Sequence, residues 1–177
     1  MSTPDISVRA ATEDDAARLA EVHVAAWRAT YRGVMTDEYL DGLDVVRAAA
    51  AWRRNIGAPA VGIEHLVVLS GTDVAGFAIL GPASSGSAPT TGQLHAINVH
   101  PDWWAQGLGS VLFEAAEQKL IELGYDRAFL WVEKGNTRAI NFYSNRRWLA
   151  DGETLEDARF DPPVAENRHS RTFPRVH

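Results

Sequence analysis

The chain has 177 residues, 46% of them hydrophobic, which suits a single folded domain spanning residues 1–177. It contains no cysteine, which excludes disulfides, a thiol nucleophile and a cysteine-ligated metal. A formal net charge of −6 argues against a nucleic-acid partner, and no apolar run reaches the roughly 20 residues that span a bilayer, so we expect a cytoplasmic protein without a membrane partner.

The first sixty residues favour one short strand and two helical regions. Ile6 to Ala10 alternates as a strand does. Thr12, followed by three acidic residues, is typical of a helix start, and apolar residues at helical spacing carry this helix to about Tyr31. Gly33 ends it, and a second helical region is expected over Asp37 to Asn55.

The middle of the chain predicts three strands. His65 to Leu69 and Val74 to Leu80 flank a Gly-Thr-Asp turn and form a hairpin. Gly81 to Gly92 is rich in Gly, Ser, Pro and Thr and reads as a surface loop, and Gln93 to His100 alternates again.

The last third alternates helices and strands. Gly107 to Leu123 is a strong amphipathic helix, Ala128 to Val132 a buried strand and Asn136 to Arg146 a further helix. Strands follow near Trp148 and over Arg168 to Phe173. The order predicts an α/β (α+β) fold, a mixed sheet with helices on both faces.

The segment His95 to Ser110 carries the first chemical signal. A strand ends at Val99, Pro101 forces a turn, and a bend containing Gly107 and Gly109 enters a helix. Such a bend places free backbone N–H groups at a helix N-terminus, where an anion can bind.

The identity of that anion does not follow from the glycines. A Walker loop requires a lysine that is absent here, and a Rossmann fingerprint requires a third glycine where this chain has Leu112. Taken alone, the G-x-G pattern is equally compatible with a plain turn into a helix.

A second motif lies between Asn136 and Trp148. The sequence NTRAINFYSNRRW resembles N-x-x-A-x-x-F-Y-x-x-x-G-F, with Arg147 and Trp148 in place of Gly-Phe. Asn136 and Tyr143 are seven residues apart and share one helix face. Asn136 as a helix cap and Tyr143 as an ordinary core aromatic remain the alternatives to a functional role.

Together, the two segments resemble the GNAT superfamily of N-acetyltransferases, whose signature is [QR]-x-x-G-x-[GA] after a strand ending in V-x-P. Trp104 stands where that family usually has Gln or Arg. The resemblance implies a central sheet of about seven strands with splayed central strands, acetyl-CoA as cosubstrate and no metal. The six histidines also lack any metal-binding spacing.

The resemblance further implies how acetyl-CoA binds. Its pyrophosphate would lie on the backbone amides of the bend, and its pantetheine arm would pair with the preceding strand. The expected cofactor-binding residues are Ile97, Asn98, Val99, Trp104, Ala105, Gln106, Gly107, Leu108, Gly109, Ser110, Asn136, Ala139, Phe142 and Tyr143.

For catalysis, Tyr143 is expected to protonate the departing thiolate, because tyrosine, with a pKa of about 10, stays protonated at neutral pH. The general base is less defined. Many family members have Glu at the position of Gln93, and glutamine cannot accept a proton, which leaves Gln93 to hold a water. His95, two residues later, is a candidate base, although a strand histidine is more often a simple hydrogen-bonding residue.

In this superfamily the first helices cover the acceptor. His23, Trp27 and Tyr31 follow at i, i+4 and i+8, and the two aromatics could form a wall for an amine or simply pack the core. The stretch AWRATYRGVMTDEYLDGL resembles a subgroup that includes polyamine acetyltransferases.

We therefore expect direct transfer of an acetyl group to a primary amine of a small molecule: a polyamine, an amino sugar or an amino-acid derivative. Acetylation of a protein N-terminus or lysine, and a non-catalytic CoA-binding sensor or interaction module, stay open as alternatives. Dimers are common in the superfamily, which leaves a homodimer open.

Overall fold

The computed structural model describes residues 5–84 and 86–174, and its framework is one seven-stranded sheet. The strand order is β1-β2-β3-β4-β5-β7-β6, with β4 and β5 parallel and every other neighbouring pair antiparallel. The strands are β1 (Ile6–Ala10), β2 (Glu64–Ser70), β3 (Asp73–Pro82), β4 (Thr91–Val99), β5 (Arg127–Glu133), β6 (Leu149–Asp157) and β7 (Val164–Thr172). The helices are α1 (Ala16–Tyr31), α2 (Asp37–Asp41), α3 (Val45–Gly57), α4 (Leu108–Glu122) and α5 (Thr137–Asn145), with short 3₁₀ turns η1 (Glu13–Asp15) and η2 (Pro101–Trp103).

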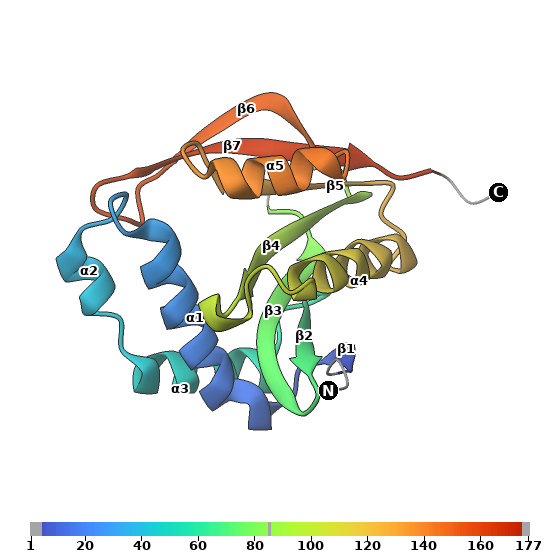
Figure 1. Cartoon of the computed structure of the whole chain (residues 1–177). Helices are drawn as coiled ribbons and strands as arrows, with labels where there is room; N and C mark the ends of the chain where they lie inside the picture. Colours follow the sequence, from blue (N-terminus) through green and yellow to red (C-terminus); the bar gives the residue numbers. More distant parts are fainter. Residues whose placement is uncertain (1–4, 85, 175–177) are drawn as a thin grey trace.

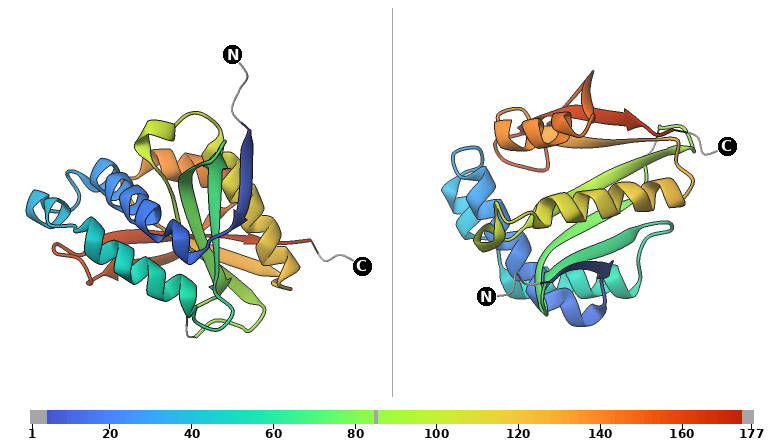
Figure 2. Two further views of the ribbon diagram at one scale, coloured as in Figure 1. Left: turned by 90° about the horizontal axis from the view of Figure 1, so that it is seen from below. Right: turned by 45° about the vertical axis from the view of Figure 1, so that its right-hand side comes forward.

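Helices cover both faces of this sheet, as the sequence predicted. Apolar side chains of α4 and α5 pack on one face around Phe113 and Trp148, whereas α1 and α3 pack on the other around Leu19 and Trp52. Figure 2 shows α4 on the opposite side of β2, β3 and β4 from α1 and α3. The mixed α/β fold expected from the element order is therefore confirmed.

The parallel strands β4 and β5 separate soon after they meet. Their register covers only residues 91–93 of β4 and 127–129 of β5. Beyond Gln93, β4 continues to Val99 paired with β3 alone, and β5 continues to Glu133 paired with β7 alone. The diverging strands are visible in Figure 1, where β5, β7, β6 and α5 form an upper layer. The splayed sheet implied by the family resemblance is present, and it leaves one edge of β4 without a strand partner.

The second helical region differs from the prediction. Instead of one helix over Asp37 to Asn55, the chain forms α2 and α3, separated at Gly42. The Asp44 side chain accepts a hydrogen bond from the Arg47 amide and begins α3 as an N-cap. Arg28 of α1 donates to the carbonyls of Leu40, Asp41 and Leu43, which satisfies backbone acceptors released by the break.

Arg147, which replaces the family's glycine after α5, adopts a left-handed backbone with φ +64°. Its side chain is exposed and makes no hydrogen bond or ion pair with a described residue. Left-handed φ costs a non-glycine residue about 1–2 kcal/mol, partly offset by the greater entropy of an unfolded glycine. We therefore expect Arg147→Gly to raise the free energy of unfolding by about 0.5–1 kcal/mol in urea denaturation. A loss of stability would show that the guanidinium contributes more than the backbone costs.

Candidate active site

A cleft of about 1160 Å³ occupies the gap between the diverging strands. Its walls come from β4, β5, the bend before α4, the inner face of α5, the C-terminal half of α1 and the β6–β7 connection. Of the predicted residues, the cleft is lined by Trp27, Tyr31, Gln93, His95, Ile97, Asn98, Val99, Trp104, Ala105, Gly107, Gly109, Ser110, Asn136, Ala139, Phe142 and Tyr143. Most residues expected to bind a cofactor and two of the three expected to bind an acceptor thus share one cavity.

Three predicted residues lie outside the cleft lining. Leu108, the first residue of α4, is only 2% exposed and packs in the core. Gln106 is exposed, and its amide donates to the Asp102 carbonyl. His23 packs edge-on against Trp27, with ring centroids 5.0 Å apart, and also contacts Trp52 of α3. Of the three residues spaced along one side of α1, only Trp27 and Tyr31 therefore line the cleft.

The bend between β4 and α4 presents backbone donors to the cleft. Gly107 has φ +85°, and a Cβ built there meets no atom within 4 Å. Its left-handed conformation begins α4, whose first backbone hydrogen bond runs from the Val111 amide to the Gly107 carbonyl. The amides of residues 108–110 therefore lack helical acceptors and are free for an anion.

Trp104 stabilises this bend through two contacts. Its indole N–H donates to the carbonyl of Val99, the last residue of β4, at 2.7 Å. The Arg138 guanidinium of α5 lies 4.2 Å from the centre of the same ring, a cation–π contact that links the two sides of the cleft. At the position where the family usually has Gln or Arg, this chain thus has a tryptophan that makes structural contacts. Sequence alone gave no sign of these contacts, because the partners are brought together only by the fold.

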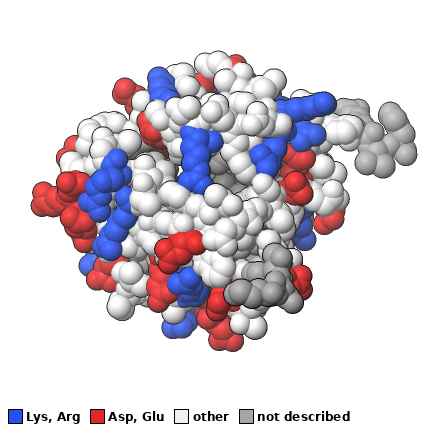
Figure 3. Space-filling view, viewed as in Figure 1, with Lys and Arg blue, Asp and Glu red and all other residues white. Residues whose placement is uncertain are grey.

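Arg138 of α5 and Arg146, which follows its last residue, add positive charge beside the bend and were missed from the sequence. Arg146 donates to the Ser110 hydroxyl at 2.6 Å and lies over the Phe142 ring at 3.7 Å. Within the described chain, no carboxylate lies within 4.0 Å of Arg138 or Arg146. In the view of Figure 3, basic side chains occupy the surface between α5 and α4. This end of the cleft therefore carries uncompensated positive charge in an acidic protein.

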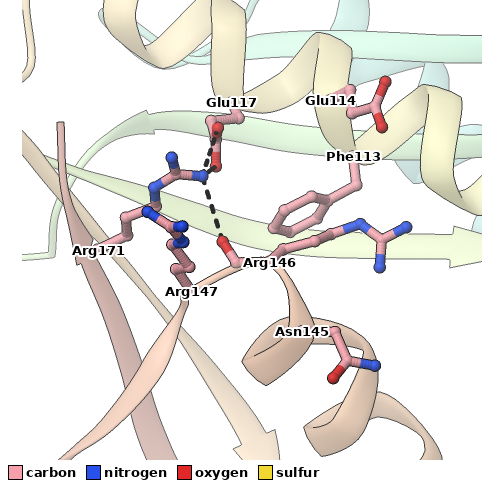
Figure 4. Close-up of a pocket in the computed structure, with 7 residues that line it drawn as sticks. All are labelled: Phe113, Glu114, Glu117, Asn145, Arg146, Arg147 and Arg171. Carbon is pink, nitrogen blue, oxygen red and sulfur yellow. Dashed lines mark hydrogen bonds and ion pairs between the residues drawn. The ribbon is translucent and has the colours of Figure 1, made fainter. Parts of the chain in front are cut away.

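A smaller pocket of about 280 Å³ lies beside it, between α4 and the end of α5 (Figure 4). Arg171 lies there with both Glu117 oxygens at 2.8 Å, and the Trp148 indole also donates to Glu117. The Arg146 side chain points away from Arg147 and Arg171 in this view. The Arg171–Glu117 pair and the Trp148 bond identify this region as a contact that fixes α4 against β7.

Asn136 and Tyr143 occupy the two ends of α5. The Asn136 side chain accepts from the Ala139 amide at 3.1 Å, so its capping role is observed. Tyr143 packs against Phe113 and Phe142, with ring centroids 5.6 Å away in both cases. No hydrogen bond joins its hydroxyl to another described residue, so the oxygen is accessible from the cleft that Tyr143 lines. Burial of the side chain raises the pKa of Tyr143, with a smaller contribution from Tyr31. The phenol is therefore protonated at neutral pH and free to donate.

The two candidate bases are both engaged. The Gln93 carbonyl oxygen accepts from the Ser84 amide at 3.0 Å and from its hydroxyl at 3.1 Å. Two residues apart on a regular strand would share one face, but His95 is the extra residue of a β-bulge, so it does not share a simple strand face with Gln93. Its Nε2 lies 2.9 Å from the Pro82 carbonyl and must carry the proton there, and burial lowers the pKa of His95.

Aromatic residues line the far end of the cleft. Trp27 contacts Tyr31 and Phe160 with ring centroids 5.3 and 5.4 Å apart, and Phe160 also meets Tyr39. Behind them, Met35 of the α1–α2 connection, Leu40 of α2 and the start of β7 form a small apolar cluster. The contacts join α1 and α2 to the β6–β7 connection across the end of the cleft.

Within the described part of the chain, no group of three or more His, Cys, Asp or Glu residues is placed to hold a metal ion. The same residues contain no helix long and apolar enough to cross a bilayer.

A sheet opened at its one parallel pair, with a donor-rich bend on one side of the opening, defines an N-acetyltransferase fold and site. The chain belongs to the acetyltransferase (GNAT) family, whose sequence profile matches residues 24–147 and so includes the first motif segment and all of the second except Trp148.

Individual proteins agree with this assignment. An uncharacterised N-acetyltransferase of Bacillus subtilis, YuaI, is 29% identical over 157 residues, covering 87% of this chain and 88% of that protein. The PaiA N-acetyltransferase of Thermoplasma acidophilum, solved with coenzyme A, superposes with a TM-score of 0.70 at 17% identity, covering 96% of this chain and 99% of that one. The yncA structure from Salmonella typhimurium, solved with acetyl-CoA, superposes at 0.71 and 17% identity, covering 98% and 96%.

Proposed function

We propose that this protein uses acetyl-CoA to acetylate a primary amine of a small molecule. The observation that carries the proposal is the juxtaposition, in one cleft, of the unpaired edge of β4, the free amides of the bend and the unpartnered Tyr143 hydroxyl. The coenzyme A and acetyl-CoA complexes of two fold relatives support the choice of donor.

In this proposal the diphosphate of acetyl-CoA binds the amides of residues 107–110, and the pantetheine arm pairs with residues 97–99 of β4 as an additional strand. The Trp104 indole N–H already donates to the Val99 carbonyl. We therefore expect the pantetheine arm to pair with the Ile97 backbone and the Val99 amide. A β4 amide facing the gap then polarises the acetyl carbonyl.

The departing sulfur is where Tyr143 acts. The CoA thiol should resemble cysteine, with a pKa of about 8.5, so Tyr143 stays protonated at a pH where that thiol begins to ionise. Burial raises the pKa of Tyr143 further and keeps the phenol protonated until the C–S bond breaks. The thiolate that forms in the same cleft also gains proton affinity as it loses water, which draws the proton to sulfur. Donation of that proton prevents an unstabilised thiolate from accumulating in the cleft.

The aromatic residues at the acceptor end favour a small cationic amine. Trp27, Tyr31 and Phe160 contact one another and line this end of the cleft. Aromatic rings attract a cationic amine by cation–π interaction. The polyamine-like N-terminal segment and these rings together support a small cationic acceptor.

An assay of free CoA release tests the proposal, with acetyl-CoA and a panel containing spermidine, glucosamine, glycinamide and a Ser-Ala dipeptide. We expect turnover with at least one small amine and an acetylated product by mass spectrometry. Transfer confined to the dipeptide would favour the protein-acetylating alternative. Acetyl-CoA binding without turnover of any amine would favour the non-catalytic module.

Arg146 provides a prediction about cofactor affinity. We expect the Arg146 guanidinium to donate to the diphosphate of acetyl-CoA, and a hydrogen bond to a charged group contributes about 1.5–3 kcal/mol. Arg146→Gln should therefore weaken acetyl-CoA binding roughly tenfold or more in calorimetry. The effect should shrink as salt is added, because it is electrostatic. Arg147→Gln is the matched control, since that neighbouring side chain is exposed and points elsewhere. Equal losses in both variants would exclude a specific role for Arg146.

A further inference from the structure

The acceptor end of the cleft contains an unusual arrangement of two glutamates. Glu133 near the end of β5 and Glu166 of β7 are directly opposite each other in antiparallel register, and both line the cleft. Side chains at such positions share one face, with Cβ atoms about 5 Å apart, and like charges there repel. The pair is destabilising unless a proton or a cation lies between the carboxylates.

Only one of the two carboxylates is engaged. Glu133 accepts a hydrogen bond from the Gly135 amide at 2.7 Å. Glu166 is partly buried, yet it has no hydrogen bond or ion pair with any described residue. Because no buried side-chain oxygen among the described residues lacks a partner, the Glu166 carboxylate is open to the cleft that it lines and can meet a ligand there.

The charged groups around Glu166 come from every neighbouring element. On β6, Asp157 is neutralised by Arg159, whose Nε donates to Asp157 Oδ1 at 2.8 Å. On β7, Arg168 is bound to Asp151 at 2.8 Å. From α1, Tyr31 faces both glutamates, and their charges add to burial in raising the pKa of Tyr31 to about 12.

We propose that Glu166 is the catalytic base, which receives the acceptor as an ammonium ion and takes its proton. This inference rests on the proposed function and gives it a substrate class: an amine that is cationic at neutral pH. Burial, with the charges of Asp157 and Glu133, raises the pKa of Glu166 and so makes it a better base, while Arg159 opposes the shift. Tyr31 and Tyr143 line the same cleft as Glu166.

The proton balance is complete without any further reactant. Glu166 takes one proton from the ammonium, and the neutral nitrogen forms a C–N bond with the acetyl carbon. The C–S bond then breaks, and the sulfur takes the Tyr143 proton. The second proton of the nitrogen returns to Tyr143 through water, and Glu166 releases its proton to solvent, so one proton is released per turnover.

The test is the isosteric substitution Glu166→Gln, assayed with whichever amine of the panel the wild-type protein acetylates fastest. General-base catalysis contributes about 10²–10⁴-fold, so we expect kcat/KM at pH 7 to fall roughly 100-fold with acetyl-CoA affinity unchanged. The acidic limb of the wild-type pH profile should disappear. In its place, the variant's rate should rise about tenfold per pH unit towards the pKa of the amine, because only the neutral amine then reacts. Glu156→Gln on β6, an exposed position, is the control and should behave as wild type.

A second measurement needs no acceptor. A carboxyl group whose pKa is raised by folding lowers stability as the pH rises through that pKa, and costs nothing below the unfolded value of about 4.3. Glu166→Gln should therefore raise the melting temperature at pH 7 to 8, and the difference should vanish near pH 4. Unchanged kcat/KM and an unchanged pH profile, or a destabilised variant, would overturn the assignment. Absence of turnover in the wild-type protein would instead contradict the proposed function, and the melting curves would still decide whether Glu166 is an unpaired carboxylate.

Discussion

Tyr143→Phe should reduce kcat by roughly 10²-fold or more while changing acetyl-CoA affinity by less than twofold. The substitution removes one oxygen from a ring held by Phe113 and Phe142 and leaves that packing in place. No hydrogen bond joins the hydroxyl to a described residue, so its loss breaks no structural hydrogen bond. Only the proton donor to the departing thiolate disappears.

Steady-state kinetics with the best amine of the panel, and calorimetry with acetyl-CoA, check this result. The defect should lie in kcat and be smaller for an acetyl donor whose leaving thiol is more acidic than CoA, such as acetyl-thionitrobenzoate. A variant as fast as wild type would remove Tyr143 from the mechanism. Loss of acetyl-CoA binding would show that the phenol is instead a binding group.

Gly107→Val should weaken acetyl-CoA binding on the order of 10²-fold, since it disturbs the bend and at least two amide hydrogen bonds to a charged diphosphate, each contributing about 1.5–3 kcal/mol. Gly107 has φ +85°, a conformation that a β-branched residue adopts only under strain. The expected effect therefore combines a stability cost with a loss of binding.

Gly124→Val separates these two effects. Gly124, just after α4, has φ +91°, and a Cβ built there also meets no atom within 4 Å. Both variants should lose about 1–2 kcal/mol of stability, but only Gly107→Val should lose affinity. Similar affinities in the two variants would show that the bend does not bind the diphosphate.

Periodicity and turn residues were sufficient to predict most elements of this fold. The main error, one helix in place of α2 and α3, arose because Asp44 caps a new helix and Arg28 binds the released carbonyls, a contact made across more than ten residues. The helix over Gly107 to Leu123 was predicted as amphipathic, and α4 buries Phe113 and Ala116 while its apolar residue Val111 and the adjoining Leu123 are 36% and 40% exposed. The helix start at Gly107 was predicted, but its orientation on the sheet was not.

The site residues in continuous segments were predicted from the sequence, whereas contacts made only by the fold were not. The bend and α5 are continuous segments with recognisable spacing, so their residues could be named from the sequence. The bulge at His95 adds one residue to β4 and so changes which face of the sheet the residues on either side of it occupy. No local feature of the sequence indicates this bulge. Glu133 and Glu166 are 33 positions apart and meet only through the β5–β7 register, which the sequence does not fix.

A crystal structure of the protein with acetyl-CoA would decide how the opened sheet holds the cofactor. We expect diphosphate oxygens on the amides of residues 107–110, the pantetheine arm along the free edge of β4, and the sulfur within hydrogen-bonding distance of the Tyr143 hydroxyl. Acetyl-CoA bound elsewhere, or a thioester directed away from Tyr143, would contradict this expectation.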